Sequence, residues 1–220
     1  MRVRGRAVNS VQQLAGSRCI LQPNPVAVLI HAPASDRVTP FDYLSVLISI
    51  VLGLGLTELL SNVHRLVQAR DRVTFHWLPV LWGVLVFVML VQWWWAAFGL
   101  HQQLEWNFFF FLLILLIPVL MYLAAASVLP TVESEQTVDL RAYYFSIHHW
   151  FFWIVATTSL LECLRAVLYA DLQAALFNAV GAALLGSLAI VRRPFYHAMT
   201  TILLAVLFVV FIVLETLRLV

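Results

Sequence analysis

The sequence predicts an all-α, polytopic membrane protein that folds as a single bundle of six transmembrane helices with short loops. The chain has 220 residues, of which 63% are hydrophobic and 11% are charged, whereas an average soluble domain carries about 25% charged residues. The apolar residues form six consecutive stretches between Asp42 and Glu215. Each stretch is close to the length, roughly 20 residues, that crosses a hydrocarbon core. A buried soluble core can imitate one such stretch, but six in succession exclude a soluble domain.

The positions of the helices follow from these apolar stretches. We expect helices at about residues 41–67, 76–98, 107–129, 143–168, 172–191 and 195–219. The connections are short, except for residues 130–142, which are polar and acidic. Short connections make neighbouring helices antiparallel, so residues 38–220 are predicted to form one transmembrane domain.

The first 37 residues differ from the rest of the chain. They contain several arginines and prolines and show no helical periodicity, and the apolar run at 26–30 is too short for a signal peptide. We expect this tail to be disordered or untranslated. Thr39, Pro40 and Asp42 suit the N-cap, N1 and N3 positions of a first helix, and we hypothesise that Val38 stands at an alternative start codon. N-terminal sequencing that recovers the tail from the mature protein would overturn this hypothesis.

The distribution of arginines predicts the orientation, because loops on the cytoplasmic side are enriched in positive charge. With residue 41 outside, the inner loops carry Arg65, Arg70, Arg72, Arg141, Arg192 and Arg193, and the outer ends carry Arg37, Arg165 and Arg218. The larger number of arginines in the inner loops favours an orientation with both the N-terminus and the C-terminus outside. The membrane is expected to be the bacterial inner (cytoplasmic) membrane. Including the four arginines of the tail makes the two counts nearly equal, so the orientation depends on the start site.

Small residues and tryptophans predict how the helices are arranged. Rows of small side chains at i+4 spacing let helix backbones approach closely in lipid, and two such rows occur: Ser45, Ser49, Gly53, Thr57 and Ser61 in the first helix, and Ala175, Ala179, Ala183 and Ser187 in the fifth. We therefore expect the first and fifth helices inside the bundle, and the third, which has almost no polar residue, against lipid. The tryptophans at 93–95 and Trp106 are predicted to lie in the membrane interface.

A first set of polar residues lies at the inner end of the first helix. Ionisable groups within spans cost about 2.5–3.5 kcal/mol each on insertion scales, so they usually face the protein interior or a water-filled cavity. Glu58, Ser61, Asn62 and Arg65 fall on one face of this helix. They form either an inner polar site or a solvated helix end.

A second set of polar residues is predicted to share one layer near the outer surface. Gln92, Glu162, Asn178 and Glu215 come from four different helices, and at 1.5 Å per residue each lies roughly 8–10 Å below that surface. Glu162 with Arg165, and Glu215 with Arg218, have the i,i+3 spacing of intrahelical ion pairs. The layer is either a vestibule whose carboxylates attract a cation or carry protons, or a set of pairs that hold helices together.

The histidines gather at the predicted inner face, and His101 alone lies outside. Imidazole binds zinc and iron, which makes His64, His148, His149 and His197 candidate metal ligands. Their spacing matches no zinc motif, and no histidine lies near mid-membrane for haem ligation. The sequence therefore indicates no particular cofactor.

The sequence narrows the function only to a class. No nucleotide-binding or hydrolase motif is present, and no basic domain suits nucleic acid. The leading hypothesis is a gated pathway or carrier for a small ion or solute, working as a homo-oligomer within the lipid bilayer, with Glu58 and Asn62 as the inner site and the four-residue layer as the outer site. The alternatives are a membrane-embedded metal- or haem-dependent oxidoreductase that uses the inner histidines, and a non-catalytic membrane subunit or sensor. The apolar middle between the two polar sets argues against a permanently open channel.

Overall fold

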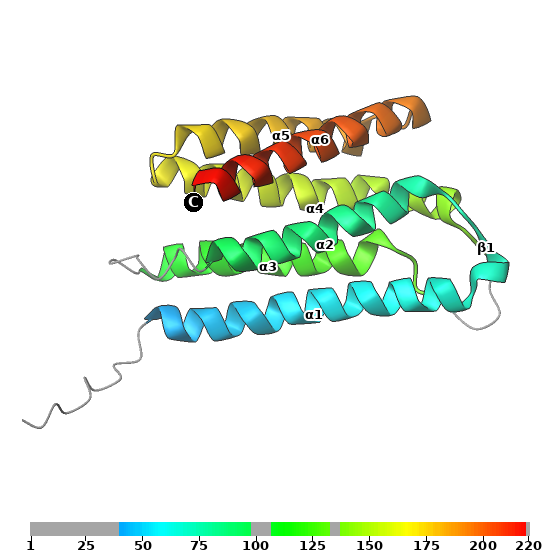
Figure 1. Cartoon of the computed structure of the whole chain (residues 1–220), viewed down its shortest axis with the longest axis horizontal. Coiled ribbons are helices and arrows are strands. Elements are labelled where there is room, and N and C mark those ends of the chain that lie inside the picture. Colours follow the sequence, from blue (N-terminus) through cyan, green and yellow to red (C-terminus); the bar gives the residue numbers. More distant parts are fainter. Residues whose placement is uncertain (1–39, 98–106, 133–136, 219–220) are drawn as a thin grey trace, which may run out of the picture. The chain divides into compact units, whose positions relative to one another are not determined.

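A computed structural model describes residues 40–97, 107–132 and 137–218. It contains six helices that are long and apolar enough to cross a membrane, which confirms the predicted all-α, six-helix fold (Figure 1). They are α1 (Pro40–Gln68), α2 (Trp77–Ala97), α3 (Phe108–Val128), α4 (Leu140–Leu168), α5 (Leu172–Ile190) and α6 (Pro194–Arg218). The tail and its proposed start site lie outside the described residues, as do His101 and Trp106.

Three of the helices begin at a residue whose side chain caps them. Asn107, Asp139 and Asp171 accept hydrogen bonds from backbone N–H groups in the first turns of α3, α4 and α5, which satisfies donors that have no partner within the helix. Asp139 also explains why α4 begins at Leu140 rather than near residue 143. Its carboxylate accepts hydrogen bonds from the backbone N–H groups of Arg141 and Ala142. The helix therefore begins within the polar connection between the third and fourth helices.

Successive helices run antiparallel, so the bundle has two ends (Figure 1). We call the end where α1 finishes and α2 begins the arginine face, because the described residues there include Arg65, Arg70, Arg72, Arg141, Arg192 and Arg193. The opposite end, where α4 finishes and α5 begins, is called the Glu162 face. At the arginine face, a short 3-10 helix η2 (Arg70–Arg72) leads into β1 (Val73–Thr74), which pairs in parallel with β2 (Val138–Asp139).

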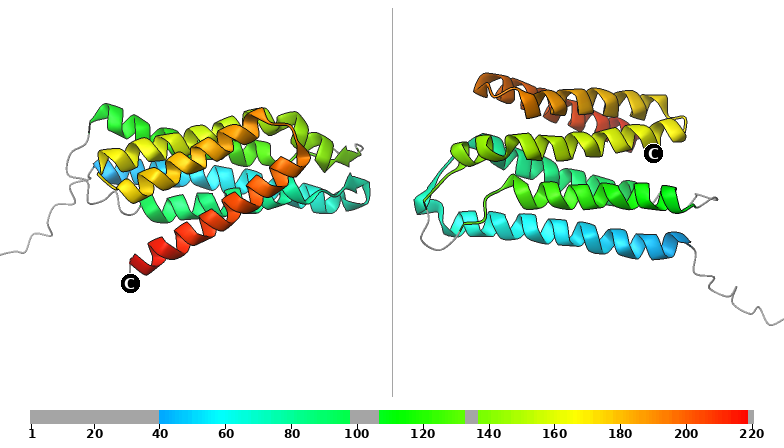
Figure 2. Two further views of the ribbon diagram at one scale, coloured as in Figure 1. Left: turned by 90° about the horizontal axis from the view of Figure 1, so that it is seen from above. Right: turned by 180° about the vertical axis from the view of Figure 1, so that it is seen from behind.

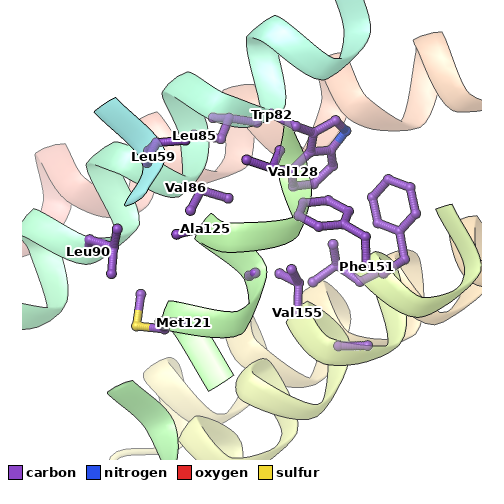
Figure 3. Packing of buried hydrophobic residues seen from close by; sticks show 14 of the residues in the cluster. Leu59, Trp82, Leu85, Val86, Leu90, Met121, Ala125, Val128, Phe151 and Val155 are labelled. Carbon is purple, nitrogen blue, oxygen red and sulfur yellow. The ribbon is translucent and has the colours of Figure 1, made fainter. Parts of the chain in front are cut away.

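The centre of the bundle is formed by α3 and α4. α3 contacts α1, α2 and α4, and the most extensive contact of all joins α4 to α5. Side chains from α2, α3 and α4 interlock in the core, among them Val86, Ala125, Phe151 and Val155 (Figure 3). α6 lies obliquely against the bundle (Figure 2) and contacts mainly α5 and α2.

The prediction that the third helix faces lipid and that the first and fifth are central was wrong. Lipid is as apolar as leucine, so a helix without polar residues has no preference for the outside, and α3 lies between α1 and α4. The row of small residues on α1 is largely exposed, including Gly53 and Thr57. The close approach occurs instead at Gly55, where an added Cβ would lie 3.4 Å from a side-chain atom of Leu90 and 3.4 Å from the Cα atom of Tyr122. α5 does pack closely against a neighbour, but at the edge of the bundle.

Candidate functional site

A cavity of about 310 Å³ at the Glu162 face brings together polar side chains from three helices. We call it the polar cavity. Its polar lining residues are Gln92 and Trp93 of α2, Thr158, Ser159, Glu162 and Arg165 of α4, Asp171, which caps α5, and Asn178 of α5. The structure therefore brings together three members of the predicted outer layer, Gln92, Glu162 and Asn178. The side chains of the fourth, Glu215, and of Arg218 lie outside the described residues.

The Glu162 carboxylate is held by donors on both of its oxygens. The Trp93 indole N–H donates to Oε1 over 2.6 Å. Nε and Nη2 of Arg165 each lie 2.8 Å from Oε2, which confirms the i,i+3 ion pair expected from the sequence. The side chain of Glu162 is 13% exposed and that of Arg165 is 29% exposed. Because this charge is neutralised within the protein, the cavity presents no free carboxylate at Glu162 to attract a cation.

The tight turn between α4 and α5 places Arg165 beside the first turn of α5. The turn is closed by a hydrogen bond from the backbone N–H of Asp171 to the carbonyl of Ala166 over 2.9 Å, and Ala170 adopts a positive φ of 57°. Nearly two turns into α5, the Asn178 amide donates to the carbonyl of Ala174 over 2.9 Å. The wall of the cavity on this side is therefore organised by hydrogen bonds within α5 and its N-terminal turn.

An apolar pocket of about 290 Å³ adjoins the polar cavity deeper in the bundle. Met89, Ser159, Phe177 and Phe208 line both spaces, so the two lie next to each other along α2, α4, α5 and α6. The combined space is polar near the Glu162 face and apolar farther in. Polar groups placed at one end of an apolar space are typical of sites for small molecules.

A buried cluster of aromatic and polar side chains closes the deep end of the apolar pocket. We call it the Trp82 cluster; its members are Trp82, Tyr144, Phe151, Phe152, His197 and Thr201, each at most 2% exposed. The Trp82 indole N–H donates to the Thr201 hydroxyl over 3.1 Å, and the Trp82 and Phe152 ring centroids are 5.0 Å apart. These contacts join α2, α4 and α6 on the side of the pocket that Trp82 lines.

His197 ties the same cluster to the connection between α5 and α6. Its Nε2 lies 2.6 Å from the carbonyl oxygen of Val191, which can only accept, so Nε2 carries the proton. In the neutral ring Nδ1 is then an acceptor, and the Tyr144 hydroxyl donates to it over 2.9 Å. Both ring nitrogens of His197 are therefore occupied by the protein.

The predicted inner site on α1 is not part of these spaces. Asn62 is fully buried and donates to the Glu58 carboxylate over a long 3.4 Å, while its Oδ1 atom is buried without a partner. Ser61 is half-buried and Arg65 is exposed. Neither Glu58 nor Asn62 borders the polar cavity or the apolar pocket.

The other candidate metal ligands are also bonded within the protein. Nδ1 of His148 lies 2.8 Å from the carbonyl of Phe145, and Nδ1 of His149 lies 3.1 Å from that of Ala189. His64 is exposed and contacts Gln68. Within residues 40–97, 107–132 and 137–218, no group of three or more His, Cys, Asp or Glu side chains is arranged to hold a metal ion.

No protein-family model, curated protein or solved structure matches this chain. The function therefore rests on the cavity and its lining. Sequence reasoning missed several of the residues that shape it, notably Trp93, which was assigned to the lipid interface with its neighbours. Trp94 and Trp95 are exposed, whereas Trp93 is turned into the bundle by the helical rotation of about 100° per residue. No sequence signal distinguishes Trp93 from its neighbours, because the tryptophan that faces the bundle is set by the rotation of α2 in the fold.

Proposed function

We propose that the chain is a membrane-embedded carrier or gated pathway for a small uncharged or zwitterionic solute. The observation that carries this proposal is the pair of adjoining spaces between the Glu162 face and the Trp82 cluster, the first lined by polar side chains and the second by apolar ones. Alternating access requires a binding space that is open to one side of the membrane at a time. The Trp82 cluster acts as the gate, since α6 must move relative to α2 and α4 for the space to reach the arginine face.

The chemistry of the lining favours this class of solute over a bare cation. Glu162 is paired with Arg165, and Asp171, the other carboxylate of the lining, accepts a hydrogen bond in the first turn of α5. A cation therefore gains little from either group while losing its hydration in an apolar surrounding. Amide and hydroxyl groups of Gln92, Asn178 and Ser159 offer hydrogen bonds to a neutral polar group. Glu58 and Asn62 have no part in this pathway, because they lie on α1 away from the cavity.

The proposal that the protein is a carrier can be tested without knowing its solute, by measuring whether a reagent reaches the binding space from each side of the membrane. Ser159→Cys, in a chain whose Cys19 and Cys163 are changed to alanine, places a thiol where the polar cavity meets the apolar pocket. A charged, membrane-impermeant methanethiosulfonate reagent is expected to modify this thiol rapidly from the Glu162 face and slowly from the arginine face. Thr157→Cys, exposed on the outer side of the same helix, should react from neither side. Modification from the Glu162 face alone would contradict transport and favour the non-catalytic subunit or sensor.

Flux into proteoliposomes tests the class of solute. Gradients of glycerol, of alanine and of potassium chloride are compared by stopped-flow light scattering. We expect flux of glycerol or alanine above that of protein-free liposomes, which Ser159→Trp blocks by filling the space and Thr157→Trp leaves unchanged. A flux of potassium that Ser159→Trp blocks would contradict the proposed solute class.

A further inference from the structure

A second and larger apolar groove lies between α1 and α2 on the half of the bundle next to the arginine face. Its volume is about 490 Å³, and it is separate from the polar cavity. Its walls include Leu60, Val63 and Val67 of α1 and Val84 and Phe87 of α2, all of them exposed. A groove with exposed apolar walls in a membrane-spanning protein is open to lipid chains.

The groove has the depth of one lipid leaflet. From Leu60 to Gln68, where α1 ends, the helix rises about 12 Å at 1.5 Å per residue. Arg70 follows at the mouth of the groove. Half of a hydrocarbon core is about 15 Å, so the groove extends from near the bilayer centre to the interface. An acyl chain of a phospholipid extends over the same distance.

One charged side chain, that of Arg70, lines the groove among the described residues, and it lies at the interfacial end. The side chain is 79% exposed, and its contact with Asp71 is a 3.8 Å pair whose partner is 90% exposed. Such an exposed pair holds the guanidinium weakly, so it is free to contact a phosphate. Arg65 and Arg141 on the same face add to the positive potential.

We propose that this groove binds an anionic phospholipid of the leaflet on the arginine-face side, with an acyl chain between α1 and α2 and the phosphate on Arg70. A basic side chain at the end of a groove between helices is the pattern that recognises anionic headgroups. The inference is independent of the transport proposal, because the groove and the polar cavity share no lining residue.

The test measures lipid binding to the purified full chain by native mass spectrometry. Phosphatidylglycerol and phosphatidylcholine with identical oleoyl chains are titrated separately. Phosphatidylglycerol is expected to bind about fivefold more tightly, the change that one interfacial arginine contributes. Arg70→Gln should remove this preference by weakening phosphatidylglycerol binding more than phosphatidylcholine binding, while Arg193→Gln, an equal change of charge outside the groove, should keep it.

A second pair of variants tests the groove itself. Val84→Trp fills the groove and should weaken binding of both lipids, whereas Val91→Trp, exposed on the same helix but away from the groove, should not. If Val84→Trp does not fold, Leu60→Trp fills the groove from α1. The proposal is overturned if Arg70→Gln keeps the preference, if Arg193→Gln abolishes it equally, or if filling the groove has no effect. It is also overturned if filling the groove dissociates an oligomer, since its occupant is then a second copy of the chain.

Discussion

Trp93 of α2 and Glu162 of α4 are joined by a 2.6 Å hydrogen bond from the indole N–H to a carboxylate oxygen. This bond connects α2 and α4, which have few direct contacts with each other, and places an aromatic ring at the wall of the polar cavity. With this bond, both oxygens of the Glu162 carboxylate have a donor, because Arg165 donates to the other oxygen. The wall of the cavity thus depends on one pair of side chains 69 positions apart in the sequence.

Trp93→Phe tests the contribution of this bond to stability. The variant replaces the indole by a smaller phenyl ring and removes the donor, so the free energy of unfolding in mixed micelles should fall by at least the roughly 1.5–3 kcal/mol typical of hydrogen bonds to charged groups. Trp94→Phe is the matched control, because Trp94 is 56% exposed and should change stability by less than about 0.5 kcal/mol. Equal effects of the two variants would show that the bond contributes nothing.

A double-mutant cycle measures the coupling between Glu162 and Arg165. Arg165→Met leaves the mostly buried carboxylate without its cation and is expected to destabilise the protein more than the double variant Glu162→Gln, Arg165→Met does, because the double variant leaves no charge behind. The coupling energy should fall between about 0.5 and 3 kcal/mol. Additive free energies of unfolding would contradict the pairing.

Gly55→Leu tests the close approach of α1 to α3. A side chain at this position meets the Tyr122 backbone, so the helices must separate at a cost of about 1–3 kcal/mol. At Gly53 nothing lies within 4 Å of an added Cβ, and Gly53→Leu should be tolerated. If Gly53→Leu is the more damaging variant, the row of small residues predicted from the sequence is the packing face after all.

Ala170→Gly is expected to stabilise the protein. Ala170 has a φ of 57°, a conformation that costs an L-residue roughly 1–2 kcal/mol and glycine almost nothing. Glycine loses about 0.5–1 kcal/mol more on folding, so a net gain of roughly 0.5 kcal/mol remains. Ala179→Gly, within α5, should instead lower the free energy of unfolding by about 1 kcal/mol. Destabilisation by Ala170→Gly would contradict the left-handed turn.

The surroundings of His76 predict that the protein loses stability in mild acid. This histidine lies just before α2, and burial, followed by the positive charge of Arg141, lowers its pKa below the ordinary 6.5, although Asp139 acts in the opposite direction. The unfolded chain therefore binds a proton at a higher pH than the folded protein does, and the contribution of His76 is lost as the pH falls below about 6.5. Unfolding of wild type and His76→Phe should be compared at several pH values, with the smaller acid loss expected for the variant. Parallel pH curves would exclude this role of His76.

The sequence was sufficient for the helices and for the grouping of Gln92, Glu162 and Asn178. Helix number follows from hydropathy alone, and the fixed rise per residue puts Gln92, Glu162 and Asn178 at one level. The order of helices around the bundle was not predictable, because an apolar surrounding does not distinguish an inner helix from an outer one. Contacts that depend on this order were missed, such as that between Trp82 and Thr201, which are 119 positions apart.

The pairing of β1 with β2 orders events during synthesis of the chain. The two strands join the connection after α1 to the start of α4, and both α2 and α3 are made between them. The pair can therefore form only when three spans have left the ribosome and the fourth is starting. Its closure at the arginine face then ties the connection after α1 to the start of α4, with α2 and α3 already made.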